Sequence, residues 1–383
     1  MHNIAKALEQ LAQSGNLRVV PSLNAVDNQI DLSSNDYLGI ASDRRFVENF
    51  FSRLSRDQLQ PASSASRLLA SRQEEYSELE KTLSTAYGRE TLLFNSGYHA
   101  NTGLIKALAS KSTLFIADKL VHASIIDGLH LAAAAGATFV RFRHNDMVHL
   151  RRIMETQAPK FERIVIVAES VYSMDGDCAD FSALVQCKQL HPNVLIYLDE
   201  AHAVGVRGLH GLGLAFGHEN YGDIDIVVGT FGKALASMGA FAAVSPTLRE
   251  YFVNTARSFI FSTALPPLTM RWSLATFQRA YNDDEARKHL AELGKTLQTI
   301  INSPVAGHIQ PLLVGNPKRA VELSQKLADN GYRVLPIRTP TVPPGTDRLR
   351  FSLSANLSQA DLLALGDILE TYSETSSPII NPD

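Results

Sequence analysis

Short apolar runs alternate with amphipathic stretches from residue 74 to residue 244. Each apolar run is too short for a typical helix and rich in β-branched residues, which is characteristic of strands covered on both faces. The runs predict strands near residues 91–95, 114–117, 138–142, 163–169, 194–199, 224–229 and 239–244. The stretches between them predict helices near residues 97–110, 122–134 and 146–157. This alternation predicts an α/β domain in which helices cover both faces of a mainly parallel sheet.

The pattern changes after Ser245, where the helical stretches become longer. Pro266 and Pro267 are expected to begin a long helix, because proline is favoured at the first helical position. Beyond this helix the sequence predicts a smaller α+β lobe, with strands near residues 309–314, 332–337 and 348–354 and helices near residues 318–330 and 358–372.

The N-terminal part of the chain predicts a short amphipathic helix over residues 4–12 and a second helix over residues 44–59. We therefore expect the chain to have three parts. They are an N-terminal segment, residues 1–40, that packs with the small lobe, a large ligand-binding domain, residues 41–270, and a small C-terminal domain, residues 271–383.

The composition is that of a globular protein without an obvious charged partner. The 383-residue chain has 36 Lys and Arg against 39 Asp and Glu, a formal net charge of −3. This balance gives no electrostatic case for binding to nucleic acid or to an anionic membrane surface. No stretch reaches the roughly 20 apolar residues of a membrane span, and residues 1–16 lack the apolar core of a signal peptide. We therefore expect a cytoplasmic protein.

One lysine occupies a position suited to chemistry. The apolar run 226–228 predicts a buried strand that continues into Gly229-Thr230-Phe231-Gly232-Lys233. The two glycines permit a tight turn, which would place Lys233 at the carboxyl end of a strand, where ligands bind in open α/β sheets. A phosphate-binding P-loop is excluded, because it needs four residues between its first glycine and Gly-Lys and a Ser or Thr after the lysine. An exposed turn lysine is the remaining alternative.

A second predicted strand ends at Asp199, with His202 three positions later. Asp199 would then lie beside Lys233 at the same edge of the sheet. Enzymes that use pyridoxal 5′-phosphate (PLP) have this pair, because a lysine carries the cofactor and an acid keeps its pyridine nitrogen protonated. A metal site at Asp199 and His202 is the alternative, but a catalytic metal normally takes three protein ligands and no third cluster stands out. We therefore expect PLP and no metal.

Three further positions have both a structural and a functional interpretation. Ser96-Gly97-Tyr98 would begin a helix whose free N–H groups favour a phosphate, although an ordinary helix start explains the same residues. His122 opens the next predicted helix, where a histidine is commonly a surface or capping residue. Arg348 and Arg350 fall on one face of the last predicted strand, and a guanidinium can make a two-point contact with a carboxylate.

Six motifs in order along nearly the whole chain resemble the α-oxoamine synthases, a family of PLP enzymes. They are residues 33–39, 95–101, 118–124, 169–177, 199–202 and 229–233. Residues 339–346, followed by Arg348-Leu349-Arg350, are most similar to the members that condense L-alanine with a pimeloyl thioester in biotin biosynthesis.

The resemblance implies the PLP-dependent transferase fold type I and a homodimer with active sites at the subunit interface. The reaction would release CO2 and a free thiol, with the acyl group arriving on coenzyme A (CoA) or on acyl carrier protein. The implied catalytic residues are Lys233, Asp199 and His122. Of these, His122 would stack on the cofactor ring. The implied cofactor-binding residues are Gly97, Tyr98, His122, Ser173, Asp199, His202, Thr230 and Lys233. The implied substrate-binding residues are Arg18, His122, Thr341 and Arg350.

The sequence also departs from the family. Ser71 and Tyr76 stand where relatives usually have a glycine and a histidine, so no substrate contact is assigned to residues 61–76. Ser262 or Thr263 would either contact a phosphate in the neighbouring subunit or form a simple turn. A synthase that uses glycine or serine with another acyl-CoA, or a non-catalytic binding protein on the same fold, remains an alternative.

Overall fold

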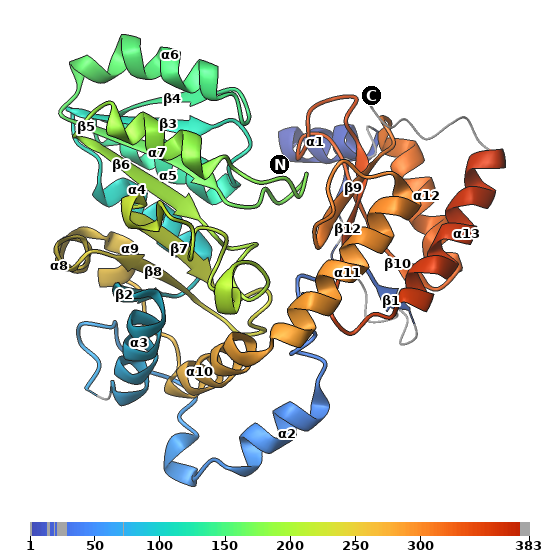
Figure 1. Ribbon diagram of the computed structural model, residues 1–383, viewed down its shortest axis with the longest axis horizontal. Helices are drawn as coiled ribbons and strands as arrows, with labels where there is room; N and C mark the ends of the chain where they lie inside the picture. The colour runs from blue at the N-terminus through green and yellow to red at the C-terminus, as the bar shows by residue number, and fades with distance from the viewer. Residues whose placement is uncertain (1, 14–15, 19, 21–28, 72, 376–383) are drawn as a thin grey trace. The chain divides into compact units, whose positions relative to one another are not determined.

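The computed structural model describes residues 2–13, 16–18, 20, 29–71 and 73–375 (Figure 1). Its contacts divide the chain into two compact units. Unit 1 comprises Met1–Tyr37, Met174–Gly176 and Lys288–Asp383, and unit 2 comprises Leu38–Ser173 and Asp177–Arg287. Residue 270, where the large domain was expected to end, lies inside a helix of unit 2, and that unit continues to Arg287.

Unit 2 is built on a seven-stranded sheet in the order β2-β8-β7-β6-β5-β3-β4. Its strands are β2 (Glu90–Phe94), β3 (Thr113–Asp118), β4 (Thr138–Phe142), β5 (Arg163–Glu169), β6 (Val194–Asp199), β7 (Ile226–Thr230) and β8 (Ala240–Val244). Only β8 runs antiparallel to its neighbours β7 and β2. The predicted mainly parallel sheet is therefore confirmed, with one reversed strand that the apolar pattern did not reveal.

Helices cover both faces of this sheet (Figure 1). The helices of unit 2 are α2 (Arg44–Ser52), α3 (Glu74–Tyr87), α4 (Gly97–Ala107), α5 (Ala123–Ala134), α6 (Met147–Gln157), α7 (Phe181–Gln189), α8 (Pro246–Thr255), α9 (Arg257–Ile260) and α10 (Pro267–Asn282). Every residue of β3, β7 and β8 is buried, which explains their unbroken apolar character. Leu104 of α4 and Ile125 of α5 join the same apolar core as Phe115 and Val167 of the sheet.

Unit 1 contains two smaller sheets. In the first, β12 (Arg348–Ser352) lies between β11 (Leu335–Ile337) and β9 (Ile309–Leu313), all antiparallel. In the second, β1 (Ile30–Asp31) pairs in parallel with β10 (Tyr332–Arg333). Its helices are α1 (His2–Gln13), α12 (Pro317–Asp329), α13 (Gln359–Thr375) and most of α11 (Asp284–Ile301).

Three predicted elements differ from the structure. The strand expected over residues 332–337 is interrupted at Val334 and forms β10 and β11, which belong to different sheets. The helix expected over residues 44–59 ends at Ser52 and is followed by a 3₁₀ turn, Arg56–Gln58. The long helix predicted from the two prolines begins at Pro267, as expected, but belongs to unit 2.

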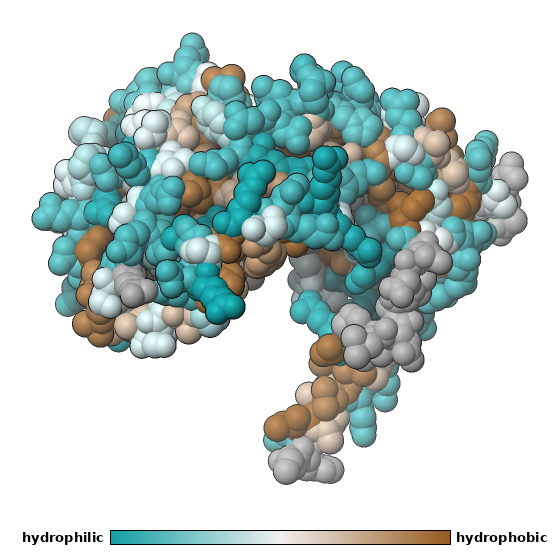
Figure 2. All heavy atoms as spheres, turned by 90° about the horizontal axis from the view of Figure 1, so that it is seen from below, coloured by the Kyte–Doolittle hydropathy of each residue, from teal (hydrophilic) through white to brown (hydrophobic). Residues whose placement is uncertain are grey.

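The face drawn in Figure 2 is mostly hydrophilic, with apolar residues lying between polar ones. Among the described residues, no helix is both long enough and apolar enough to cross a membrane.

Candidate active site

Lys233 lies in a tight turn between β7 and β8. The backbone N–H of Phe231 donates to the carbonyl of Gly239, and that of Ser237 donates to the carbonyl of Phe231, which closes the turn. The left-handed residues of this turn are Ala236 and Gly239, with φ angles of 46° and 107°. Gly229, which we expected to shape the turn, has another role: a Cβ there would lie 2.3 Å from the Phe241 ring. Gly229 therefore permits close packing inside the sheet.

Asp199 and His202 follow the neighbouring strand β6, as predicted. Asp199 is 5% exposed, and its carboxylate accepts hydrogen bonds from the Asn101 side chain at 2.8 Å and from the backbone N–H of Ala201 at 2.9 Å. The Lys233 Nζ lies 2.8 Å from His202 Nε2. Two adjacent strand ends thus bring an amine, an imidazole and a buried carboxylate to one edge of the sheet.

The start of α4 presents free backbone N–H groups to a cavity. Ser96 caps the helix by accepting from the backbone N–H of His99 at 3.2 Å. In the described part of the chain, no group accepts a hydrogen bond from the N–H of Gly97 or Tyr98. Both residues line the same cavity as Thr230. Free N–H groups at the positive end of a helix dipole suit a phosphate.

These groups surround one cavity of about 160 Å³ in unit 2. Its lining residues are Gly97, Tyr98, Asn101, His122, Ser124, Glu169, Asp199, Ala201, His202, Thr230 and Lys233. Of the predicted cofactor-binding residues, only Ser173 is not part of this lining, although it is buried. Asn101, Ser124 and Glu169 were not predicted. Asn101 could have been found, because it lies four residues after Gly97 and so on the same helix face.

Burial changes the protonation of two groups in the cavity. Burial, reinforced by the nearby Asp199 carboxylate, raises the pKa of Glu169 well above its usual range. The Glu169 carboxyl group accepts from the backbone N–H of His122. Burial also lowers the pKa of His122, and the opposing attraction of Asp199 does not cancel this effect. His122 is therefore a neutral imidazole at pH 7.

The donor set fits PLP. The cofactor needs an amine for covalent attachment, a carboxylate for its ring nitrogen and an anion site for its phosphate. The cavity supplies these in Lys233, Asp199 and the free N–H groups of Gly97 and Tyr98. Among the described residues, no cluster of three histidine, cysteine or carboxylate side chains could hold a metal ion.

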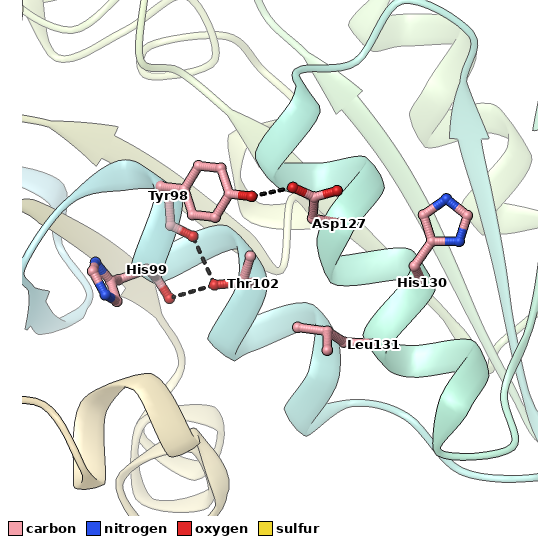
Figure 3. Close-up of a pocket in the computed structure, with 6 residues that line it drawn as sticks. All are labelled: Tyr98, His99, Thr102, Asp127, His130 and Leu131. Atoms are coloured by element: carbon pink, nitrogen blue, oxygen red, sulfur yellow. Dashed lines mark hydrogen bonds between the residues drawn. The ribbon is translucent and has the colours of Figure 1, made fainter. Parts of the chain in front are cut away.

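Tyr98 also borders a second hollow, of about 490 Å³, on the surface of α4 and α5 (Figure 3). Its hydroxyl donates to the Asp127 carboxylate across this hollow, and His99, Thr102, His130 and Leu131 complete the lining. The hollow contains neither Lys233 nor Asp199. Tyr98 therefore presents its backbone N–H at the helix start while its ring packs toward α5.

The predicted substrate-binding residues of unit 1 form two groups. Arg350, 6% exposed on β12, donates to Ser352 Oγ at 2.7 Å and to Tyr37 Oη at 3.3 Å. Arg348 instead forms an ion pair with Asp175. Arg18 Nη2 donates to Thr341 Oγ1 at 3.0 Å, and both residues line a separate cavity of about 210 Å³.

Comparison with known proteins defines the class first. Residues 27–369 match the family model "Aminotransferase class I and II". A serine palmitoyltransferase from S. paucimobilis, solved with a bound PLP–myriocin aldimine, is 26% identical, with a TM-score of 0.88 and coverage of 97% of each chain. The chain belongs to the aminotransferase class I and II family, and it is a PLP-dependent enzyme of fold type I.

The particular relatives are 8-amino-7-oxononanoate synthases, within the α-oxoamine synthases. The one from Haemophilus ducreyi is 44% identical over 390 residues, which cover 95% of this chain and 99% of the relative. A solved synthase of that name from Francisella tularensis is 26% identical, with a TM-score of 0.74 and coverage of 92% of this chain and 100% of that chain. The resemblance drawn from the six motifs and the expected cofactor PLP are thus confirmed.

A histidine bound between two carboxylates supports the loop that carries Ser173. The ring nitrogens of His144 lie 2.9 Å from Asp118 Oδ1 and 2.8 Å from Asp177 Oδ2. Burial disfavours the charged ring, but the hydrogen bonds to Asp118 and Asp177 outweigh it and raise the pKa of His144 to about 10. The ring is therefore a cation at pH 7, and it links the end of β3 to the loop after β5.

We expect this link to make stability depend on pH. The folded-state pKa lies above the unfolded value of about 6.5, so the stabilisation is complete below pH 6.5, declines above it and is lost as the pH passes 10. At pH 6, His144→Gln should lower the free energy of unfolding by about 1–3 kcal/mol, the cost of losing hydrogen bonds to charged groups that are partly buried. Urea unfolding from pH 6 to pH 10 measures this, with His191→Gln as the control. A constant difference across this range would contradict the assignment.

Proposed function

We propose that this protein condenses L-alanine with a pimeloyl thioester to give 8-amino-7-oxononanoate, CO2 and a free thiol. The single observation that carries the proposal is the cavity that joins Lys233, Asp199 and the free N–H groups of Gly97 and Tyr98. It occurs in a chain that is 44% identical to an 8-amino-7-oxononanoate synthase over nearly the full length of both proteins.

Several residues of the cavity would hold the cofactor. Lys233 would bind it covalently through Nζ, and Asp199 would keep a proton on its ring nitrogen. The phosphate would be bound at Gly97 and Tyr98, together with Thr230. The neutral His122 ring would stack on the cofactor, His202 would donate to the ring hydroxyl, and Ser173 would add a hydrogen bond. When bound, PLP withdraws electrons from the α-carbon of an amino acid.

Lys233 has a second role in the proposed reaction. Once alanine has displaced it from the cofactor, its free amine would take the proton from the alanine α-carbon, as a general base. A new bond then joins that carbon to the thioester carbonyl carbon, and the thiol leaves. Loss of the alanine carboxylate as CO2, return of the α-proton from Lys233 to that carbon and one proton from water for the departing thiolate complete the balance. Both proton transfers at the α-carbon require an amine held at the cavity, and Lys233 Nζ meets this requirement.

The cavity at Arg18 and Thr341 fits the far end of the acyl chain. A pimeloyl group that arrives on CoA ends in a carboxylate, which a guanidinium binds well. Arg338 also lines this cavity. We therefore assign Arg18 and Thr341 to the acyl substrate and Arg350 to alanine.

We expect Arg350→Lys to weaken alanine binding while leaving cofactor binding intact. Lysine keeps the charge but loses the planar fork that contacts both oxygens of a carboxylate. The loss should be about 1.5–3 kcal/mol, or roughly 10- to 150-fold in apparent affinity. Titration of the cofactor's absorption with L-alanine measures it, and Arg333→Lys, an exposed arginine of the same unit, is the control. Native affinity in Arg350→Lys would leave Arg350 with a structural role only.

A homodimer is supported by apolar side chains that unit 2 leaves exposed. Ser66 and Thr263 form a β-bridge that joins two surface segments. Beside it, Leu68, Leu69 and Phe261 are 51%, 79% and 68% exposed. Such a cluster is typical of a surface that another chain covers. We assign this surface to a second copy of the chain.

We expect Leu69→Asp to weaken the homodimer at least tenfold, because a carboxylate would have to lose its hydration on association. Light scattering over a dilution series measures the dissociation constant. Val148→Asp, at another residue that is 78% exposed, is the matched control. A native protein that is monomeric at all concentrations, or an unaffected Leu69→Asp dimer, would contradict this assignment.

The test of the reaction is amino-acid-dependent release of free thiol. The purified protein, which should be yellow from bound cofactor, is supplied with alanine, glycine or serine and with several acyl thioesters. Serine with palmitoyl-CoA is the main alternative, because the solved serine palmitoyltransferase has a TM-score of 0.88 against this chain. We expect thiol release with alanine and a pimeloyl thioester. Fastest release with another pair, or none with any, would overturn the proposed substrates.

A further inference from the structure

The Asn101 side chain joins three buried groups beside the cavity. Its Nδ2 donates to Asp199 Oδ2 at 2.8 Å and to Ser124 Oγ at 2.9 Å. Its Oδ1 accepts from the Tyr197 hydroxyl at 2.6 Å. Asn101 is 1% exposed, and Tyr197 and Ser124 are fully buried. Both N–H groups and the oxygen of one amide are thus used, each by a different partner.

Tyr197 fixes which way the amide faces. Burial, reinforced by Asp199, raises the pKa of Tyr197 well above its usual range, so its hydroxyl remains a donor. The amide oxygen of Asn101 must therefore face Tyr197, and the NH2 group must face Asp199. The reverse orientation would place an amide oxygen against a carboxylate oxygen and leave two donors facing each other.

The second N–H of Asn101 leads to His122. Ser124 Oγ accepts from Asn101, so its own proton is directed to His122 Nδ1 at 2.7 Å. The backbone N–H of Ser124 also donates to this Nδ1, at 3.2 Å. Because Nδ1 accepts twice, the neutral His122 ring carries its proton on Nε2. The orientation of Asn101 is thereby transmitted to the tautomer of His122.

We propose that Asn101 is a positioning residue that holds the Asp199 carboxylate and the His122 ring in one arrangement toward the cofactor. This inference rests on the proposed cofactor contacts of Asp199 and His122. Its physical basis is the charge-assisted hydrogen bond to Asp199, which is stronger than a neutral one and is buried from competing water. Tyr197 supports Asn101 in turn, and Ser124 carries the effect to His122.

The cofactor-bound protein is titrated from pH 5 to pH 10 while its visible absorption is followed, and the dissociation constant of PLP is measured. Asn101→Asp places a second carboxylate beside Asp199 and should raise the midpoint of this titration by about one pH unit or more, because added negative charge favours protonated forms. Asn101→Ser removes both N–H donors and should weaken PLP binding about tenfold or more. Tyr197→Phe adds no charge but removes the support of the Asn101 amide, so it should weaken PLP binding by a smaller factor.

Thr102→Val is the matched control, because Thr102 also lies on α4 but its hydroxyl donates to backbone oxygens of that helix. It should keep the native midpoint and affinity. Folded Asn101 variants with native values would overturn the proposal. If they fail to fold, a native PLP affinity in Tyr197→Phe would overturn it instead. If the protein binds PLP at Lys233 but releases no thiol, the proposed reaction is refuted and the role of Asn101 is not. The titration midpoint and the PLP affinity depend only on bound cofactor.

Discussion

Replacing Lys233 with alanine is expected to abolish turnover, with a fall in kcat of about 10⁴-fold or more. The size follows from the two proposed roles of this side chain, because general base catalysis alone contributes about 10² to 10⁴ and covalent attachment of the cofactor adds to it. Lys233 is the one lysine among the described residues that lines the cavity. The fold should survive, because the turn is closed by backbone hydrogen bonds that the side chain does not make.

Borohydride reduction followed by peptide mapping checks the attachment directly. The native protein should carry the reduced cofactor on Lys233, and the Lys233→Ala protein should carry none. Lys111→Ala, at an exposed position, is the matched control and should keep both label and activity. A label on another lysine would refute the assignment, whatever the activity of the variant.

Asp199→Asn is expected to lower kcat by about 10² to 10⁴ while the protein still binds its cofactor. Asparagine keeps one acceptor oxygen for the Ala201 N–H, so the turn after β6 should persist, although its NH2 group replaces the oxygen that accepts from Asn101. A neutral amide cannot keep the pyridine nitrogen protonated, however, and the electron-withdrawing power of the cofactor would fall. The loss should appear in kcat far more than in the dissociation constant of PLP.

Steady-state kinetics and circular dichroism of Asp199→Asn distinguish this effect from loss of structure. Asp225→Asn is a useful control, because Asp225 pairs with Lys188 at 2.7 Å before β7, at the other end of the sheet. It should reduce stability and spare kcat. Near-native turnover in a cofactor-bound Asp199→Asn protein would make Asp199 a purely structural residue.

The sheet and the main residues of the cavity could be predicted because their signals lie in short stretches of the sequence. A buried strand that stops at a polar residue is visible in the order of residues, and parallel neighbours place such ends together. Lys233 and Asp199 could therefore be assigned to one edge of the sheet from the sequence alone. The free N–H groups at Gly97 and Tyr98 followed from the same rule, applied to the start of a helix.

What the sequence did not predict depends on contacts between distant segments. The reversal of β8 agrees with the nine-residue connection 231–239 to β7, which is too short for a parallel crossover, but the apolar pattern of residues 240–244 alone does not record it. The role of Gly229 comes from the ring of Phe241, its partner on the neighbouring strand β8. The helical spacing from Gly97 could place Asn101 on the cavity side of α4, but its partners Asp199 and Tyr197, 98 and 96 residues away, could not be inferred from the sequence.

Unit 1 is built from separate chain segments, and this affects the order in which the protein folds during synthesis. Gln29 donates to the carbonyl of Ala328, 299 residues further on, next to the pairing of β1 with β10. A ribosome adds about 5–20 residues per second, so the N-terminal segment must wait roughly 15–60 s for its partner strand to emerge. Unit 2 can complete its sheet during this interval. The first segment to be synthesised is therefore among the last to find its native contacts, and it is exposed to proteases and chaperones until then.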